Sequence, residues 1–267
     1  MQQDSITNAD IEQIGKLQPD GWPDIREAFK FYINSDFCYP VKISMDDKIV
    51  GTGSSIIFKT TAWIAHIIVD KEYRNRGIGS AIVDHLLKDI KRRAIDTVLL
   101  IATEIGEPVY KKAGFRIVSD YIFHKRESPW KEITVSDKIR PFKSEFYNEI
   151  MRLDREISGE YREPLISKHL DNSYVYIDNG MIKGFYLPAL ADGPIFAGTT
   201  VAGVELMKMK YAKVDKAVLP GENQIGIEFL KQHGFIVTET KGKRMILGKE
   251  VAWQPEKFFS RAGGNFG

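Results

Sequence analysis

The chain has 267 residues, of which 43% are hydrophobic and 28% charged, a balance that excludes a disordered chain and suits one large domain or two ordinary ones. Its net charge of +2 comes from acidic and basic residues mixed along the chain, so charge selects neither a nucleic acid nor a membrane as partner. The single cysteine, Cys38, excludes an intrachain disulfide and a cysteine-rich zinc site, and its sequence neighbours favour packing over a nucleophilic role.

The start of the chain, "MQQDSITNADIEQIG", is polar and lacks the apolar core of a signal peptide. No apolar run approaches the ~20 residues that a membrane span needs. We therefore expect a soluble protein of the cytoplasm.

The first half of the chain alternates between helical and strand patterns. Apolar residues at helical spacing predict four helices, over 8–17, 24–35, 77–94 and 106–115. Apolar and β-branched runs predict a hairpin over 39–58 that turns at Asp46-Asp47, and strands over 61–70, 97–103 and 116–123.

The second half partly repeats this order. The polar stretch "HKRESPW" at 124–130 predicts a boundary, which gives domains over 1–128 and 129–267. Beyond it we expect a hairpin over 173–189 that turns at Asn179-Gly180, then strand, helix, strand and helix. The final helix carries "LKQHGF", which matches "YKKAGF" in the first half with both Gly-Phe pairs in register, 235 − 115 = 120 positions apart. That spacing indicates a domain duplication.

A turn with two glycines and two arginines joins the predicted strand over 61–70 to the predicted helix over 77–94. The first N–H groups of a helix have no intrahelical partner, and the helix dipole adds about half a positive charge there, so a helix start attracts anions. Gly77 and Gly79 leave room for a phosphate, and Arg74 and Arg76 can add charge-assisted hydrogen bonds. The turn matches neither a P-loop nor the three-glycine dinucleotide fingerprint, and "GTGSS" at 51–55 lies in the predicted hairpin without a following helix.

R-x-x-G-x-G after "IIVDKEY" and before an amphipathic helix resembles the acetyl-CoA-binding motif of the GNAT family of N-acetyltransferases. "VYKKAGF" resembles that family's last helix and strand, and the resemblance covers residues 1–125 in order. It implies an α+β fold of two tandem GNAT-like domains, each a mixed, mostly antiparallel sheet flanked by helices. The second half has no R-x-x-G-x-G, so acetyl-CoA binding is not expected there. Its segments "RLDREISGEYREPLI" at 152–166, "DGPIFA" at 192–197 and "KRMILG" at 243–248 resemble the degenerate C-terminal domain of a bacterial tandem-domain subfamily.

The resemblance also implies a donor site. The central strand would splay from its neighbour and bind the pantetheine arm through the backbone of Ile67, Ile68 and Val69. The pyrophosphate would lie against the residues of the turn: Arg74, Asn75, Arg76, Gly77, Ile78, Gly79 and Ser80. Thr103 occupies a position where the family often has an asparagine that contacts coenzyme A.

Tyr110 stands where the family usually keeps a tyrosine that protonates the departing thiolate. A phenol with a pKa near 10 is a credible acid for this step. Three alternatives remain open for the base that takes the amine proton: His66, Glu104 or ordered water.

The second half reverses this arrangement, with Asn223 in the asparagine position and Leu230 in place of the tyrosine. The resemblance marks Asp154 and Arg162, which would either line an acceptor pocket or form a surface ion pair. The glycine-rich tail, "SRAGGNFG", is expected to fray.

Taken together, these features predict an enzyme that transfers acetyl from acetyl-CoA directly to a primary amine of a small metabolite in a ternary complex. We expect no metal, nucleic acid or membrane partner, and a monomer or a homodimer. Two alternatives remain: an acetyltransferase acting on protein or peptide amines, and a non-enzymatic acyl-CoA-binding sensor.

Overall fold

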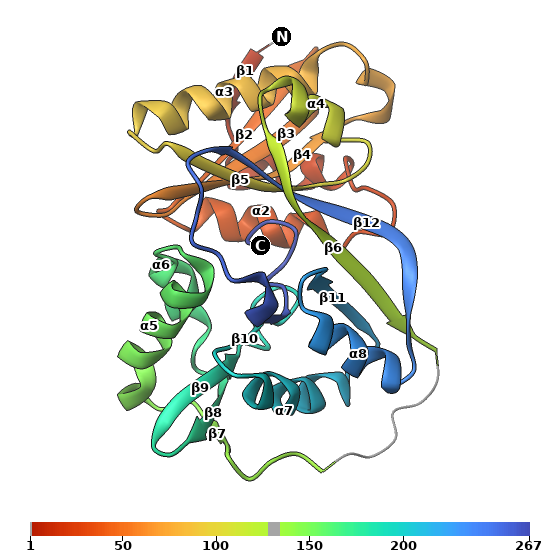
Figure 1. Ribbon diagram of the computed structural model, residues 1–267. Helices are drawn as coiled ribbons and strands as arrows, with labels where there is room; N and C mark the ends of the chain where they lie inside the picture. Colours follow the sequence, from red (N-terminus) through yellow and green to blue (C-terminus); the bar gives the residue numbers. More distant parts are fainter. Residues whose placement is uncertain (1, 128–133) are drawn as a thin grey trace. The chain divides into compact units, whose positions relative to one another are not determined.

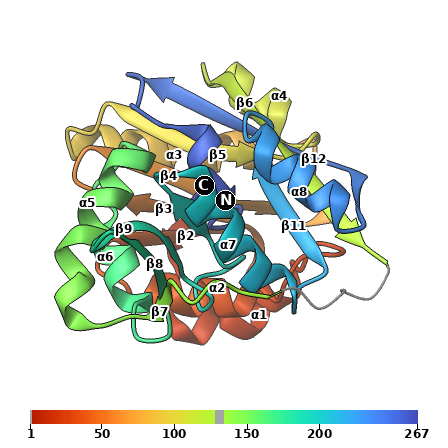
Figure 2. The same ribbon diagram turned by 60° about the horizontal axis from the view of Figure 1, so that its bottom comes forward.

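The computed structural model describes residues 2–127 and 134–267, and the chain forms two compact units (Figures 1 and 2). The first unit comprises Met1–Leu100, Ile105–Arg116 and Ile246–Lys249; the second comprises Ile101–Glu104, Ile117–Met245 and Glu250–Gly267. Each unit is thus built from three separate ranges of the chain, whereas the sequence predicted two continuous domains. The predicted boundary at residue 128 lies outside the described residues. Among the described residues, none of the helices combines the length and apolar character of a membrane span.

The first unit is built on a sheet with the order β1-β2-β3-β4-β5. Neighbouring strands are antiparallel except for β4 and β5, which are parallel. The strands are β1 Gln2–Ser5, β2 Cys38–Met45, β3 Lys48–Ile57, β4 Thr61–Val69 and β5 Thr97–Ala102. The helices are α1 Ile11–Gly15, α2 Ile25–Ile33, α3 Ile78–Arg92 and α4 Glu107–Lys112. Figures 1 and 2 show α2 and α3 on opposite faces of this sheet.

Two glycines of β3 allow α3 to approach the sheet closely. A Cβ at Gly53 would lie 2.6 Å from side-chain atoms of Ile67 and Ile82, and one at Gly51 would lie 2.9 Å from Ile78. The apolar stripe predicted for this helix is buried against the sheet as expected. The "GTGSS" segment is therefore part of a strand, as the sequence pattern indicated, and the structure adds that its glycines make room for α3.

Both predicted hairpins are confirmed. Asp46 and Asp47 have positive φ angles of 49° and 59°, and Asn179 and Gly180 have angles of 49° and 74°. Two successive residues with positive φ form the tight turn whose twist matches the strands on either side. Asp, Asn and Gly tolerate this backbone better than other residues, which is why the short sequences identified the turns.

The second unit contains the five-stranded sheet β13-β10-β9-β8-β7, in which each neighbouring pair is antiparallel. Its strands are β7 Ile139–Pro141, β8 Tyr174–Asp178, β9 Met181–Tyr186, β10 Ile195–Ala197 and β13 Phe258–Ser260. The unit also holds most of β6 Arg116–Arg126, β11 Lys216–Pro220 and most of β12 Phe235–Gly248. Its helices are α5 Tyr147–Ser158, α6 Glu163–Ile166, α7 Thr200–Tyr211 and α8 Gln224–Gln232. The predicted mixture of helices with mainly antiparallel sheets is confirmed.

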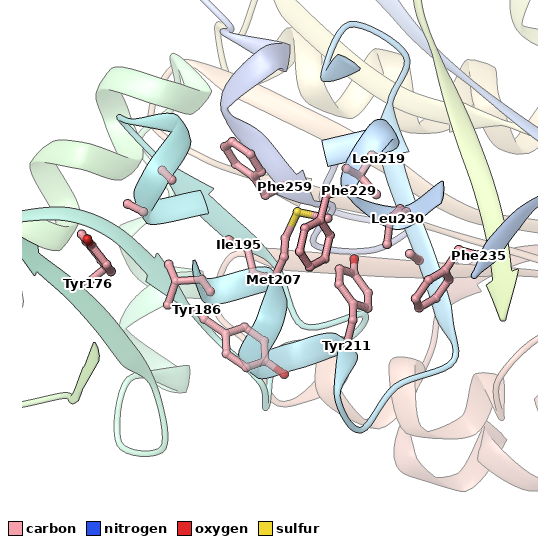
Figure 3. Close-up of a cluster of buried hydrophobic side chains, with 14 residues drawn as sticks. Tyr176, Tyr186, Ile195, Met207, Tyr211, Leu219, Phe229, Leu230, Phe235 and Phe259 are labelled. Carbon is pink, nitrogen blue, oxygen red and sulfur yellow. The ribbon is translucent and has the colours of Figure 1, made fainter. Parts of the chain in front are cut away.

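A core of aromatic and aliphatic side chains joins α7 and α8 to the strands of the second unit (Figure 3). Leu230 is fully buried in it, together with Met207 and Tyr211 of α7. Leu230 is the residue that replaces the tyrosine of the first half, so at this position the second half has a core residue.

The prediction of a fraying tail is wrong. Phe266 is buried, and its carbonyl oxygen accepts a hydrogen bond of 3.3 Å from Nη1 of Arg162. The Ala262 N–H also donates to the Gly267 carbonyl at 2.6 Å. One buried aromatic side chain and a partner for the backbone outweigh the flexibility of the glycines around it.

Candidate functional site

The strands β4 and β5 separate within the first unit. They pair in parallel at only three positions: Thr61 with Thr97, Ala62 with Val98, and Trp63 with Leu99. Strand β4 then continues to Val69 without a further pair to β5. The end of β4 therefore has a backbone edge that β5 does not pair with and that can offer hydrogen-bonding groups to a ligand.

A bulge lies in this same stretch of β4. Thr52 pairs with Ile68 and Ser54 with Ala65, so Gly53 alone faces both His66 and Ile67. His66 has a φ of 52°, an unusual angle for a residue other than glycine. A bulge bends the strand and redirects its side chains, and such irregularities are common beside active sites.

The turn after β4 opens α3 with exposed backbone donors. Gly77 is the N-cap residue with a φ of 80°, and the Ala81 N–H donates to its carbonyl at 3.0 Å. The N–H groups of Ile78, Gly79 and Ser80 precede that bond and have no intrahelical acceptor. A Cβ at Gly77 would point into open space, so the approach to these donors is clear.

The arginines of the turn are held by backbone oxygens and an aromatic ring. Arg74 Nε donates to the Val69 carbonyl at 3.3 Å, and Arg76 Nη2 donates to the Glu72 carbonyl at 3.1 Å. The Arg76 guanidinium also lies 5.0 Å from the centre of the Tyr73 ring. Each of these hydrogen bonds uses one of the five N–H donors of a guanidinium, and both side chains stay exposed.

Tyr110 lies on α4 and is 8% exposed, with its ring 6.0 Å from that of Phe115 in an edge-to-face contact. Burial raises the pKa of its phenol, because the charged phenolate loses hydration there. The residue therefore stays protonated at neutral pH, the state that a proton donor needs.

His66 contacts aromatic residues of the α2 region. Its Nδ1 lies 2.8 Å from the Tyr32 hydroxyl, and its ring meets those of Trp22, Phe29 and Tyr32 edge-on. Burial lowers the pKa of His66 to about 4, so the imidazole is neutral at pH 7. The sequence did not identify Tyr32 as a partner of His66, because a tyrosine on the apolar stripe of a helix is typical of a core residue.

The remaining predicted site residues of the β5–α4 region are exposed. Thr103 and Glu104 follow β5 and belong to the second unit. The first unit thus brings together Ile67–Val69, the turn 74–80 and His66 on consecutive segments, and it also contains Tyr110.

Asp154 and Arg162 form an ion pair, but in the interior of the second unit. Arg162 Nη2 lies 2.5 Å from Asp154 Oδ1, and the two side chains are 1% and 3% exposed. The guanidinium also lies 4.8 Å from the centre of the Phe196 ring. This ion pair is a packed element of the unit rather than a surface feature.

The second unit also contains a pocket of about 250 Å³ lined by the starts of α7 and α8 and by residues 256, 257 and 259. Asn223 lines it, but its amide is occupied within the protein. Its Oδ1 accepts from the Gly226 N–H at 2.7 Å, and its Nδ2 donates to the Phe258 carbonyl at 2.9 Å. This asparagine therefore caps α8 and anchors β13.

Comparison with known proteins gives consistent similarities. The model of the acetyltransferase (GNAT) family matches residues 5–115. The uncharacterized N-acetyltransferase YitH of Bacillus subtilis (strain 168) is 26% identical over 200 residues, which cover 70% of this chain and 69% of that protein. A putative acetyltransferase from Pyrococcus horikoshii has a similar fold, with a TM-score of 0.83 at 21% identity over 100% of this chain and 95% of that one. A GCN5-related N-acetyltransferase from Sphaerobacter thermophilus has a TM-score of 0.65 at 15% identity, over 95% of this chain and 98% of that one.

Proposed function

We propose that the chain is an N-acetyltransferase, from the premise that residues 5–115 match the model of the GNAT family, and that its first unit transfers acetyl from acetyl-CoA to a primary amine of a small metabolite. The observation that carries the proposal is the separation of β4 from β5 directly before the open start of α3. The unpaired end of β4 would bind the extended pantetheine arm of the donor, and the start of α3 directly after it would bind the diphosphate.

The residues present fit the donor. Three backbone N–H groups, at Ile78, Gly79 and Ser80, and the guanidinium groups of Arg74 and Arg76 supply hydrogen bonds and positive charge for the diphosphate. The free edge of β4 at Ile67–Val69 supplies backbone groups for the pantetheine arm. Bound acetyl-CoA would provide an activated thioester, and the amine nitrogen would replace its sulfur on the acetyl carbon.

Tyr110 would supply the proton that the departing sulfur needs. Its raised pKa keeps the phenol protonated until the thiolate forms, and burial shields the transfer from bulk water. A backbone N–H at the open edge of β4 would donate to the thioester oxygen as negative charge develops on it.

Among the three candidates for the base, we favour ordered water. His66 binds a proton weakly, with a pKa near 4, and its Nδ1 already contacts the Tyr32 hydroxyl. Glu104 is exposed, so its carboxylate is well hydrated. Water that drains the amine proton to the solvent needs no side chain with a matched pKa.

The decisive experiment measures thiol release from acetyl-CoA with a panel of small amines and, in parallel, with lysine peptides. We expect release with at least one small amine, together with calorimetric binding of coenzyme A to the free protein. Thiol release with the lysine peptides alone would contradict a small-metabolite acceptor and would favour acetylation of protein amines. Binding of coenzyme A without release for any amine would favour a sensor.

Tyr110→Phe tests the assignment of the acid. We expect kcat to fall about a hundredfold or more, while the Kd of coenzyme A stays within about twofold, since general acids contribute ~10²–10⁴. Tyr186→Phe is a matched control, because Tyr186 is also 8% exposed but lies in the second unit. An unchanged kcat in Tyr110→Phe would remove Tyr110 from the mechanism.

A further inference from the structure

The connection between α1 and α2 presents a half-exposed tryptophan. Trp22 is 41% exposed, so a large part of its indole surface faces the solvent. The backbone N–H of Trp22 donates to the Pro19 carbonyl at 3.3 Å, and Gly21 beside it has a φ of 76°.

A single glutamine side chain holds this loop in shape. Gln18 Nε2 lies 3.2, 3.0 and 3.1 Å from the carbonyl oxygens of Pro19, Trp22 and Pro23. Its Oε1 accepts from the Ile25 N–H at 3.0 Å. These contacts fix the backbone on both sides of the indole, so the ring is preorganised and loses little entropy when something binds to it.

The charged residues of the loop are already paired. Asp20 lies 2.8 Å from Lys71 Nζ, and Asp24 lies 2.7 Å from Arg26 Nη2 and also accepts from its Nε. Each carboxylate of the loop therefore already has a cationic partner, and the apolar face of Trp22 is the uncharged surface that the loop offers to a ligand.

Trp22 stands next to the stretch proposed to hold the donor. Its ring centre is 5.8 Å from that of His66 at an angle of 77°. His66 is the residue directly before Ile67–Val69, where β4 has left β5. An amine whose nitrogen reaches the thioester at this edge would place its carbon skeleton within reach of the indole.

We propose that Trp22 determines acceptor specificity by stacking against the substrate, and that the acceptor is a primary amine carrying an aromatic ring. The inference rests on the proposed function of the first unit. The edge-on contacts of His66 with Trp22, Phe29 and Tyr32 extend the same aromatic surface behind the indole. An aromatic ring gains stabilisation there beyond the area it buries, whereas an alkyl chain gains only the area.

The test is calorimetric binding of 2-phenylethylamine and n-hexylamine to the full chain saturated with coenzyme A. We expect the wild-type protein to bind 2-phenylethylamine more tightly than n-hexylamine. Trp22→Ala should raise the Kd of 2-phenylethylamine about five- to tenfold, and Trp22→Phe should keep it within about twofold. Tyr161→Ala serves as the control, because Tyr161 is 37% exposed but lies in the second unit.

Gln18→Glu provides a second, isosteric variant that removes the Nε2 donors without touching the indole. It should weaken binding of 2-phenylethylamine while coenzyme A binds as before. Equal binding of 2-phenylethylamine to wild type and Trp22→Ala, or no binding of either amine to the wild type, would overturn the inference. Loss of binding in Trp22→Ala without any amine turnover by the wild type would support Trp22 recognition and refute the proposed function.

Discussion

The turn that begins α3 depends on the backbone conformation of single residues. Gly77 has a φ of 80°, which most residues adopt only with strain, and it leaves open space in front of the α3 donors. Gly180, in the hairpin turn of the second unit, has a φ of 74° and equally open space. The two glycines therefore have similar strain and similarly open space, and they differ in that Gly77 is the residue that begins α3.

Gly77→Ala should weaken coenzyme A binding at least tenfold, because its methyl group would enter the space in front of the N–H donors. Gly77→Ala and Gly180→Ala should both lower the free energy of unfolding by about 1–2 kcal/mol, the cost of the left-handed backbone. Calorimetry and denaturant unfolding separate the two effects. Equal affinity in both variants would show that the start of α3 does not bind the donor.

His66 makes stability depend on pH. Burial lowers its pKa to about 4 in the folded protein, whereas an unfolded histidine has a pKa near 6.5. Between these values the unfolded chain binds more protons, so the stability that His66 contributes is complete above about pH 6.5 and is lost as the pH falls toward 4. His66→Asn removes the titration and retains a residue that tolerates positive φ.

Denaturant midpoints at pH 7 and pH 4.5 measure this effect. The wild type should lose more stability between these two values than His66→Asn. His233→Asn is the control, because His233 is the C-cap residue of α8 in the second unit and does not belong to the bulge. The same pH dependence in wild type and His66→Asn would mean that His66 is not the group that titrates.

At the level of elements, the position of α3 depends on the glycines of β3. Gly53→Ala would bring a methyl group within 2.6 Å of Ile67 and Ile82, so these side chains or the helix must shift. We expect a loss of about 1–3 kcal/mol, typical of overpacking. Gly198→Ala is the control, because its methyl would meet Leu153 at an ordinary 3.5 Å.

Thermal unfolding should therefore show a lower Tm for Gly53→Ala than for Gly198→Ala. Since Ile67 belongs to the stretch proposed to hold the pantetheine arm, Gly53→Ala should also weaken coenzyme A binding. A Tm equal to that of the wild type would mean that α3 and β3 can adjust without cost.

Most elements could be predicted from the sequence. The hairpins were identified by Asp46-Asp47 and Asn179-Gly180, and α3 by its apolar stripe, because these signals are local. The strands β1, β7 and β13 were missed, since each has only three or four residues and no alternation that a pattern could reveal. Their existence depends on a neighbouring strand that offers hydrogen-bonding partners.

At the level of the whole molecule, a substitution in the buried ion pair of Asp154 and Arg162 can test whether this pair stabilises the second unit or binds the substrate. Asp154→Asn would leave the Arg162 charge buried without its partner. We expect the free energy of unfolding to fall by about 3–5 kcal/mol. The KM for the amine should stay within about twofold when it is measured below the unfolding temperature.

Replacing both residues tests whether the ion pair has only a packing role. The double variant Asp154→Leu with Arg162→Met removes both charges and should recover much of the stability lost by Asp154→Asn. If the KM for the amine rises in Asp154→Asn under conditions where the variant is fully folded, the ion pair contributes to acceptor binding.

The sequence by itself determined the fold class, the hairpin turns and the order of strand, glycine turn and helix, because these follow from local periodicity and backbone preference. The N-acetyltransferase class also followed from the motifs R-x-x-G-x-G and "VYKKAGF", because each is a short run of residues that can be recognised without knowing the tertiary contacts. Only the tertiary structure decided that β4 leaves β5 after Trp63, that His66 becomes a weakly basic residue beside Tyr32, and that Asp154 and Arg162 are buried. Burial and strand pairing join residues far apart in the chain, and no local pattern records which of those contacts form.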